Sequence, residues 1–340
     1  MNKVLIKNFN ENKIEGIIDA GFNFYGLDKK LASIKSVFIK PNLVTDVKEY
    51  IEQGANTDIR IIEAVIKYLS RDPNLKVFLG ESETGTKIKG RRLDLALELM
   101  GVKKLQNKYN FQIVNLTYDK KISIRIPEGK FLKRIELGKT LWDADLIINL
   151  PKIKTHKYAT VTCALKNMFG VIPNPLRIKY HQNIHQVIAD LNRLFYDKMF
   201  VITDGIVGME GQGPLYGEKI NLGIILFADN PLLNDVAAAK IMRFNPQAIR
   251  HLILTNNWAK EDIDNTELIG NLNILNAARK FKPANKNLFV KAEGFLMQFP
   301  WIVRVLFNEW VQKNITYHFN KILKKLRGGS YSWYIDSKKK

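Results

Sequence analysis

Hydrophobic and polar positions follow two patterns along the chain, and each pattern predicts one kind of secondary structure. Short apolar runs rich in Val, Ile and Leu are typical of buried strands, whereas apolar positions three and four residues apart are typical of helices. Buried strands are predicted at residues 36–44, 75–82, 111–117, 144–156, 199–211 and 221–230. Helices are predicted at residues 58–70, 91–105, 184–195, 235–244 and 245–256.

The order of these elements predicts the fold class. Strand-then-helix units fill the first third of the chain, as in α/β proteins with a mostly parallel sheet and flanking helices. Residues 121–137 alternate with a period of two and predict a β-hairpin insertion that turns at Glu128-Gly129. We expect an α/β catalytic-type core over residues 1–280 and a basic, aromatic-rich helical C-terminal tail over residues 281–340.

Polar groups gather where four of the predicted strands end. The four segments are residues 40–44, 80–85, 149–156 and 203–214. Each segment alone is better explained as a loop whose turns need Gly, Pro and Asn. Because ligands of open α/β sheets bind at the carboxyl ends of strands, we expect the four segments together to form one site.

The segment "KTHKYATVTCALKNMFG", residues 154–170, combines a histidine with lysines and small residues. His156 follows a predicted strand, where an imidazole can move protons on a bound substrate near neutral pH. Lys154 and its neighbouring lysines favour a carboxylate or phosphate and lower the pKa of His156. Lys166 lies in an apolar run, where desolvation makes lysine a base, a nucleophile or an anion anchor. The alternative is a Lys166 side chain that reaches solvent and a His156 with only a loop role.

Further candidates are the side chains that share these strand ends. Lys40, Asn42 and Asn167, with Lys154, are the predicted cofactor-binding side chains. Gly208 and Gly211 lack a side chain and let backbone N–H groups approach an anion closely. Residues 208–214 contain neither the P-loop nor the dinucleotide-binding spacing of glycines.

Two pairs of residues suggest a metal. His181 and His185 are four residues apart on a predicted helix, a spacing that can present two imidazoles to one ion. The glutamate of zinc proteases is missing between them, and for His185 a packing role is favoured. Asp204 and Glu210 are candidate metal ligands or an acid/base pair. The alternative for this second pair is a turn aspartate and a solvated glutamate.

Positive charge is most concentrated in the C-terminal tail. The chain has 53 Lys+Arg against 33 Asp+Glu, a formal net charge of +20. From residue 281 on, twelve basic and three acidic residues give +9. No nucleic-acid-binding motif is present, so a lysine-rich solvated surface is favoured over a nucleic-acid site. Within residues 285–327, an apolar, aromatic stretch is followed by a lysine-rich one, a pattern that an anionic membrane surface as partner would explain. A helix packed on the core or at a homo-oligomer contact is the alternative.

The single cysteine, Cys163, and the polar start of the chain limit the remaining classes. One cysteine excludes an internal disulfide and a 4Fe-4S cluster held by one chain. A divalent metal or a nucleotide-type cofactor stays open. No secretory signal is visible, so we expect a cytoplasmic protein, peripheral on the inner face of the membrane if the tail binds there.

Residues 35–255 resemble the domain of unknown function 362 family, through "KPNLV", "DLIINLPKIKTHKYATVTCALKNMFGVIP", "YHQNIHQVIADLN" and "ITDGIVGMEGQGPLYG". Many of its members carry ferredoxin-type cysteine motifs, from which this chain departs. A remoter similarity is to the lactate racemase family, which uses a nickel-pincer nucleotide. His156, Lys166 and His181 follow in that family's order, and the resemblance implies acid–base chemistry and cofactor attachment or ligation. The chain has "TVTCALKN" where that family has glycines, which argues against an attached pincer cofactor.

Three classes of function are therefore compatible with the sequence. The first is an enzyme, isomerase-like or oxidoreductase-like, that acts on a small anionic carboxylate or phosphate by proton transfer or redox chemistry. The second is a non-catalytic protein that binds an anion or cofactor in the same pocket. The third is a nucleic-acid binder, which would depend on net charge. The clustered strand ends favour them in that order.

Overall fold

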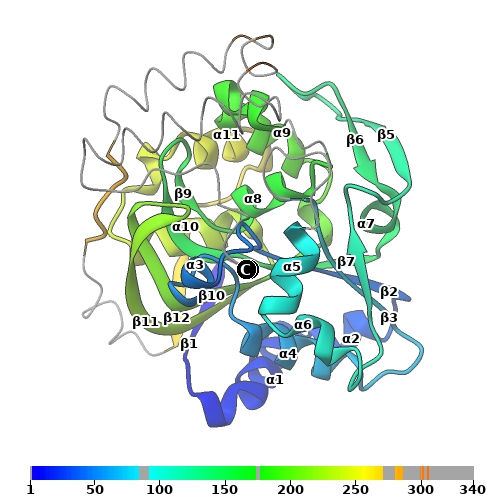
Figure 1. Ribbon diagram of the computed structural model, residues 1–340. Coiled ribbons are helices and arrows are strands. Elements are labelled where there is room, and N and C mark those ends of the chain that lie inside the picture. Colours follow the sequence, from blue (N-terminus) through cyan, green and yellow to red (C-terminus); the bar gives the residue numbers. More distant parts are fainter. Residues whose placement is uncertain are drawn as a thin grey trace.

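The computed structural model describes residues 2–83, 92–173, 177–270 and 280–285, with residues 299, 301 and 305. Its central sheet has the strand order β12-β1-β11-β10-β7-β2-β3-β4, and β8 joins β10 and carries β9 (Figure 1). The strands are β1 (Lys3–Asn8), β2 (Ser36–Pro41), β3 (Lys76–Glu81), β4 (Gln112–Asn115), β7 (Leu146–Leu150), β8 (Lys152–His156), β9 (Thr160–Thr162), β10 (Met199–Gln212), β11 (Tyr216–Ala228) and β12 (Glu267–Gly270). Among the described strands of this central sheet, only β1/β11, β10/β11 and β8/β9 are antiparallel pairs, so the predicted mostly parallel α/β sheet is confirmed.

Helices cover both faces of the sheet. They are α1 (Ile14–Phe24), α2 (Leu27–Leu31), α3 (Lys48–Glu52), α4 (Ile59–Leu69), α5 (Arg92–Leu99), α6 (Val102–Leu105), α7 (Lys139–Asp143), α8 (Ala164–Asn167), α9 (Ile184–Asn192), α10 (Pro231–Ile241) and α11 (Arg250–Ala259). Short 3-10 turns lie at η1 (Glu11–Lys13), η2 (Met168–Val171), η3 (Arg177–Asn183), η4 (Tyr196–Lys198) and η5 (Pro246–Ala248). Helices α1, α2, α4 and α6 lie on one side of the sheet, and α8 to α11 lie on the other (Figure 1).

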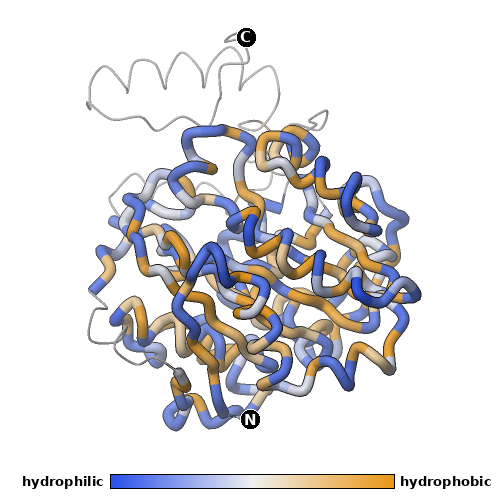
Figure 2. The backbone as a smooth tube through the Cα atoms, turned by 90° about the horizontal axis from the view of Figure 1, so that it is seen from below, coloured by the Kyte–Doolittle hydropathy of each residue, from blue (hydrophilic) through white to orange (hydrophobic). Residues whose placement is uncertain are grey.

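Alternation along the strands explains the two layers. In β2, Val37 and Ile39 belong to the hydrophobic core under α1 and α4, whereas Phe38 belongs to the core under α8 to α11. Successive side chains of a strand point to opposite faces, so a strand covered on both faces is apolar throughout. Figure 2 shows the result as hydrophobic segments inside and hydrophilic ones at the periphery.

Two predicted elements are each divided into two shorter ones, at a proline and at a glycine. The strand predicted over residues 144–156 divides at Pro151 into β7 and β8, because proline has no N–H for the ladder. The helix predicted over residues 91–105 divides at Gly101, whose φ of 80° no helical residue adopts. The hairpin is present as β5 (Lys121–Arg125) and β6 (Arg134–Gly138). Its loop is longer than the predicted turn, because Arg125 and Arg134 are the last residues paired.

The segment 203–214 differs most from its prediction as a polar strand end. It lies mostly inside β10, which pairs with β11 from Val201 to Gln212 and shifts register between Gly205 and Val207. The tail predicted over residues 281–340 lies almost entirely outside the described residues. Residues 280–285 are described, and Phe281 is fully buried with its N–H donated to the carbonyl of Met242 at 3.1 Å.

Candidate functional site

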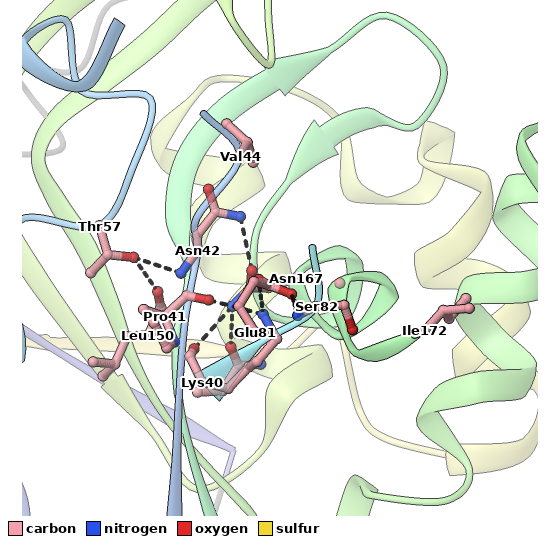
Figure 3. Close-up of polar contacts among 12 residues, drawn as sticks. Lys40, Pro41, Asn42, Val44, Thr57, Glu81, Ser82, Leu150, Asn167 and Ile172 are labelled. Atoms are coloured by element: carbon pink, nitrogen blue, oxygen red, sulfur yellow. Dashed lines mark hydrogen bonds and ion pairs between the residues drawn. The ribbon is translucent and has the colours of Figure 1, made fainter. Parts of the chain in front are cut away.

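A buried ion pair joins the carboxyl ends of β2 and β3. Lys40 Nζ lies 2.5 Å from Glu81 Oε2 and also donates to the carbonyl of Pro41 (Figure 3). Burial lowers the pKa of Lys40, and the Glu81 carboxylate opposes that shift. A side chain at Gly170 would place its Cβ 2.5 Å from Glu81 Oε1, so this glycine makes room for the carboxylate.

Three asparagine side chains connect this pair to β7, β8 and α8. Asn42 Nδ2 donates to Asn167 Oδ1 at 2.8 Å, and Asn167 Nδ2 donates to Asn149 Oδ1 at 2.7 Å (Figure 3 shows the first two residues). Lys154 Nζ donates to Asn42 Oδ1 at 2.7 Å and to the carbonyl of Ala55 at 2.8 Å. All four side chains are buried. The predicted binding residues Asn42, Lys154 and Asn167 therefore form one network, and its hydrogen bonds fix their orientation.

The side chains beside this network, Lys166 and Arg177, form a cationic cluster with His156 and His181. Lys166 lies in α8, one residue before its end, and is half-buried, with its amine 4.3 Å from the centre of the Phe169 ring. Burial lowers the pKa of Lys166 to about 7, and the charges of Arg177 and Lys40 add to that shift while Glu81 opposes it. Among the described residues, none hydrogen-bonds to the Lys166 amine or pairs with its charge in a salt bridge. Half-buried Arg177 donates through one terminal nitrogen to the carbonyls of Gly170 and Ile172.

His156 and His181 lie close to Lys166, and Phe169 connects them. Their rings stack with centroids 6.3 Å apart, and the Phe169 ring lies 5.2 Å from His181. Thus Phe169 contacts both Lys166 and His181. His156 is buried, and burial, followed by the charge of Lys166, holds its pKa well below the usual range. The fold therefore places the three predicted catalytic residues, His156, Lys166 and His181, close to one another.

The tautomer of His156 follows from its hydrogen bonds. Its Nδ1 accepts from the backbone N–H groups of Tyr158 and Ala159, both at 3.1 Å. An imidazole nitrogen that accepts hydrogen bonds carries no proton. In the neutral ring the proton is consequently on Nε2, which is left to act as a donor.

The predicted metal carboxylates have structural partners. Asp204 is buried and accepts from Lys152 Nζ at 2.7 Å, from the N–H of Asp58 at 2.7 Å and from the N–H of Ile206 at 3.0 Å. Glu210 is buried and accepts from the N–H of Lys282 at 2.8 Å. Within the described ranges no three His, Cys, Asp or Glu side chains could hold one metal ion. A metal role for Asp204 and Glu210 stays a prediction.

The two glycines predicted to bind an anion have structural roles in β10 and its contacts. Gly211 donates its N–H to the carbonyl of Lys282 at 2.8 Å, so this N–H is not available to an anion. Gly208 lies in β10, and a Cβ there would lie 3.2 Å from the carbonyl oxygen of Ile153 and 3.1 Å from Leu222. Close strand packing therefore explains Gly208.

His181 and His185 do not form the predicted pair on one helix. His181 lies in η3, and α9 begins only at Ile184, so the two imidazoles belong to different elements. His185 stacks on His251 with centroids 5.7 Å apart, whereas His181 stacks on His156. The two imidazoles therefore stack on different histidines, and a shared metal ion stays a hypothesis.

Sequence reasoning missed three residues of this buried polar and cationic cluster. Glu81 and Asn149 lie in polar strand ends that were recognised, but no motif marks them individually. Arg177 lies in a 3-10 turn whose sequence, "RIKYHQN", has no distinctive spacing. Cys163 was expected to be a small buried residue, and it is 1% exposed.

Comparison with known proteins yields one family and one distant curated relative. A family model described as "Domain of unknown function (DUF362)" matches residues 37–240. The thylakoid-associated protein sll1697 of Synechocystis sp. is 26% identical over 224 residues, which cover 63% of this chain. The match spans 64% of that protein's length, less than two thirds.

Two solved structures share parts of the arrangement. A Thermotoga maritima protein solved by a structural genomics consortium has 11% identity and a TM-score of 0.41, over 69% of this chain and 59% of its own. The lactate racemase apoprotein of Thermoanaerobacterium thermosaccharolyticum has 13% identity and a TM-score of 0.37, over 71% and 57%. At these scores neither structure contributes to the assignment of function.

Proposed function

The chain belongs to the DUF362 family, whose description names no activity. From the cationic side-chain cluster we propose that it binds a small carboxylate or phosphate between Lys166 and Arg177 and transfers a proton on it. The observation that carries the proposal is the Lys166 amine, which is half-buried, lies against an aromatic ring and has no carboxylate partner. A buried cation without a counter-charge is costly, and a bound anion removes that cost.

Arg177 supplies the second contact of the proposed anion site. One terminal nitrogen of its guanidinium is bound to two carbonyls, which fixes the group beside Lys166. Arginine stays protonated even though burial lowers the pKa of Arg177. Its remaining N–H donors match the planar, two-oxygen edge of a carboxylate or the oxygens of a phosphate.

Lys166 and His156 are the proposed proton carriers. With a pKa of about 7, Lys166 changes its charge near neutral pH, which suits an acid or base of the reaction. Neutral His156 donates through Nε2, because two backbone N–H groups occupy Nδ1. His181, stacked on His156, borders the same space. An isomerase-like proton transfer at carbon next to a carboxylate is compatible with these three groups.

Native purification tests this function. Small acids released from the purified protein are identified by mass spectrometry, then returned to the protein in D₂O and followed by NMR. Deuterium incorporation at carbon is the expected result, and Arg177→Lys should weaken binding of the acid about tenfold, because lysine lacks the two-donor fork. Binding without incorporation would indicate a non-catalytic binding protein. No binding of any small acid or of phosphate contradicts the proposal.

We further propose that the tail binds an anionic membrane surface. Trp301 is 67% exposed, Val305 is 52% exposed, and the tail carries a net +9. The relative from Synechocystis is named as thylakoid-associated. The structure contains, in the residues it describes, no helix long and apolar enough to cross a membrane. Truncation after Asn285 keeps the Lys282–Glu210 contact and should abolish sedimentation with phosphatidylserine vesicles; unchanged sedimentation contradicts the proposal.

A further inference from the structure

The β5–β6 hairpin presents two like charges opposite each other on its solvent face. Ile135 and Leu137 belong to the hydrophobic core and Ile124 packs against it, so one face of the hairpin is covered. Arg125 and Arg134 are direct partners in the ladder and are exposed on the other face. Like charges directly opposite each other destabilise a strand pair. Neither guanidinium forms an ion pair with any residue that the structure describes, so both charges are left for an anion from outside.

The loop at the tip of the hairpin adds an exposed aromatic ring among these cations. Phe131 is 38% exposed, and Lys130 and Lys133 on either side of it are exposed as well. The next residue, Leu132, is 5% exposed, so the loop buries one apolar side chain and leaves its neighbour in solvent. One exposed phenylalanine is ordinary by itself. Together with the flanking charges it matches a surface that is anionic outside and apolar beneath.

One buried carboxylate holds the loop in this conformation. Asp190 of α9 accepts from three consecutive backbone N–H groups, those of residues 130, 131 and 132, at 2.9, 2.7 and 2.8 Å. Asp190 is 0% exposed, and Gln186 Nε2 also donates to it at 2.8 Å. The backbone that carries Phe131 is therefore fixed before any partner is bound, which lowers the entropic cost of docking.

The whole hairpin is basic and lies at the rim of the molecule. Residues 121–138 contain five basic and two acidic side chains. One of the acids, Glu128, is already paired with Arg193 at 3.4 Å. Figure 1 shows β5 and β6 at the periphery, apart from the central sheet. Charge and position therefore favour an extended anionic surface as partner.

We propose that the tip of the β5–β6 hairpin, residues 125–134, docks on an anionic phospholipid bilayer, with the Phe131 ring entering the interface and the flanking basic side chains contacting the lipid phosphates. A bilayer offers phosphates with an apolar layer directly beneath them, whereas a nucleic acid presents its phosphates without such a layer. The inference does not depend on the anion site at Lys166. It concerns a surface of the core and goes beyond the proposed role of the tail.

The test is an environment-sensitive dye, NBD, attached at residue 131 of the full chain through Phe131→Cys. Cys163, the single natural cysteine, is 1% exposed and does not compete for the dye. With phosphatidylserine vesicles, NBD emission should rise about twofold or more and shift to the blue, because the dye leaves water. Phe24→Cys is the matched control, since Phe24 is 37% exposed and ends α1, far from the hairpin in Figure 1. Emission at residue 24 should stay unchanged.

The charges are tested separately in the chain without dye. Arg125→Gln combined with Arg134→Gln should weaken vesicle binding about fivefold or more, whereas Lys29→Gln with Lys30→Gln, which removes two exposed charges from α2, should have little effect. Equal losses in the two double variants overturn the inference, because they show attraction by net charge alone. An emission rise with a DNA duplex but not with vesicles also overturns it, in favour of a nucleic acid.

The hairpin and the tail can fail independently. Unchanged emission at residue 131 while the full chain sediments with vesicles overturns the hairpin inference and leaves the tail proposal standing. Sedimentation that persists after truncation at Asn285, with the emission change at residue 131 retained, contradicts the tail proposal and supports the hairpin.

Discussion

The Lys166 amine lies 4.3 Å from the centre of the Phe169 ring and makes no hydrogen bond or salt bridge to the residues that the structure describes. An aromatic face stabilises a cation by about 0.5–2 kcal/mol, less than burial of an unpaired charge costs. Lys40 and Lys152, in contrast, have carboxylate partners in Glu81 and Asp204. Lys166 therefore differs from these two buried lysines in being ready for an external anion.

Replacing Lys166 with methionine should remove anion binding and leave the fold intact. Lys166→Met keeps an unbranched apolar chain over the Phe169 ring, and it removes a charge that burial disfavours. Phosphate affinity, measured by calorimetry, should fall at least tenfold while Tm stays equal or rises. Lys198→Met is the matched control, because Lys198 also lies over aromatic rings and is bound to carbonyls elsewhere. Equal affinity in Lys166→Met and wild type would exclude Lys166 from the anion site.

The depressed pKa of Lys166 gives a pH dependence with a defined sign. The amine titrates at about pH 7 in the folded chain, against an ordinary value of 10.5. Between these two values the unfolded chain binds a proton that the folded chain has lost, so this group makes folding more favourable as pH rises. Anion binding needs the charged amine and should weaken as pH rises through 7. Urea unfolding of wild type and Lys166→Met from pH 6 to 9.5 should show a smaller rise of the free energy of unfolding with pH in the variant. The same pH dependence in both proteins would contradict a depressed pKa of Lys166.

Glu81→Gln should destabilise the chain strongly. The substitution leaves the buried Lys40 ammonium without its counter-charge, a change that typically costs about 3–5 kcal/mol in the free energy of unfolding. Glu98→Gln is the control, because Glu98 is 69% exposed and lies 3.9 Å from Lys103. Glu98→Gln should change the free energy of unfolding by no more than about 0.5 kcal/mol. Urea denaturation of both variants checks the difference, and equal values would show that the Lys40–Glu81 pair is unimportant for folding.

Gly170→Ala should disturb the same ion pair from the opposite side. The new Cβ would lie 2.5 Å and 2.8 Å from the two oxygens of Glu81, so the carboxylate has to move away. We expect a loss of about 1–3 kcal/mol in the free energy of unfolding. Gly16→Ala is the control, because Gly16 is exposed in α1 with nothing near its Cβ, and alanine favours the helix. A Gly170→Ala variant as stable as Gly16→Ala contradicts the packing described for Glu81.

The sequence allowed the fold class and the meeting of His156, Lys166 and His181 to be predicted, because both follow from local patterns. Buried strands show themselves as β-branched runs, and the carboxyl ends of neighbouring parallel strands lie at one edge of a sheet. Among the polar residues at that edge, His156, Lys166 and His181 were selected because they follow the order found in the lactate racemase family. The mostly parallel sheet agrees with the first expectation, and the three side chains do lie near one another, while their catalytic role stays a prediction.

What could not be predicted depends on contacts between distant segments. Arg177 acts on Lys166 from a 3-10 turn whose sequence shows no periodicity, and His185 stacks on His251, 66 residues later in the chain. Asp204 and Glu210 have the composition of metal ligands, but Lys152 and the backbone of Lys282 occupy their oxygens. A residue type and a spacing specify what a side chain can bind, and only the tertiary neighbours specify what it does bind.

The most direct measurement is the apparent pKa of Lys166 by competitive labelling, without and with saturating inorganic phosphate or a small monocarboxylate. Without an anion the account predicts a value of about 7, because burial and the neighbouring charges of Arg177 and Lys40 disfavour the ammonium. A bound anion should raise the pKa of Lys166 by one unit or more, since it favours the charged amine. A pKa near the ordinary 10.5 without ligand, or a value near 7 that no anion shifts, would contradict the anion site.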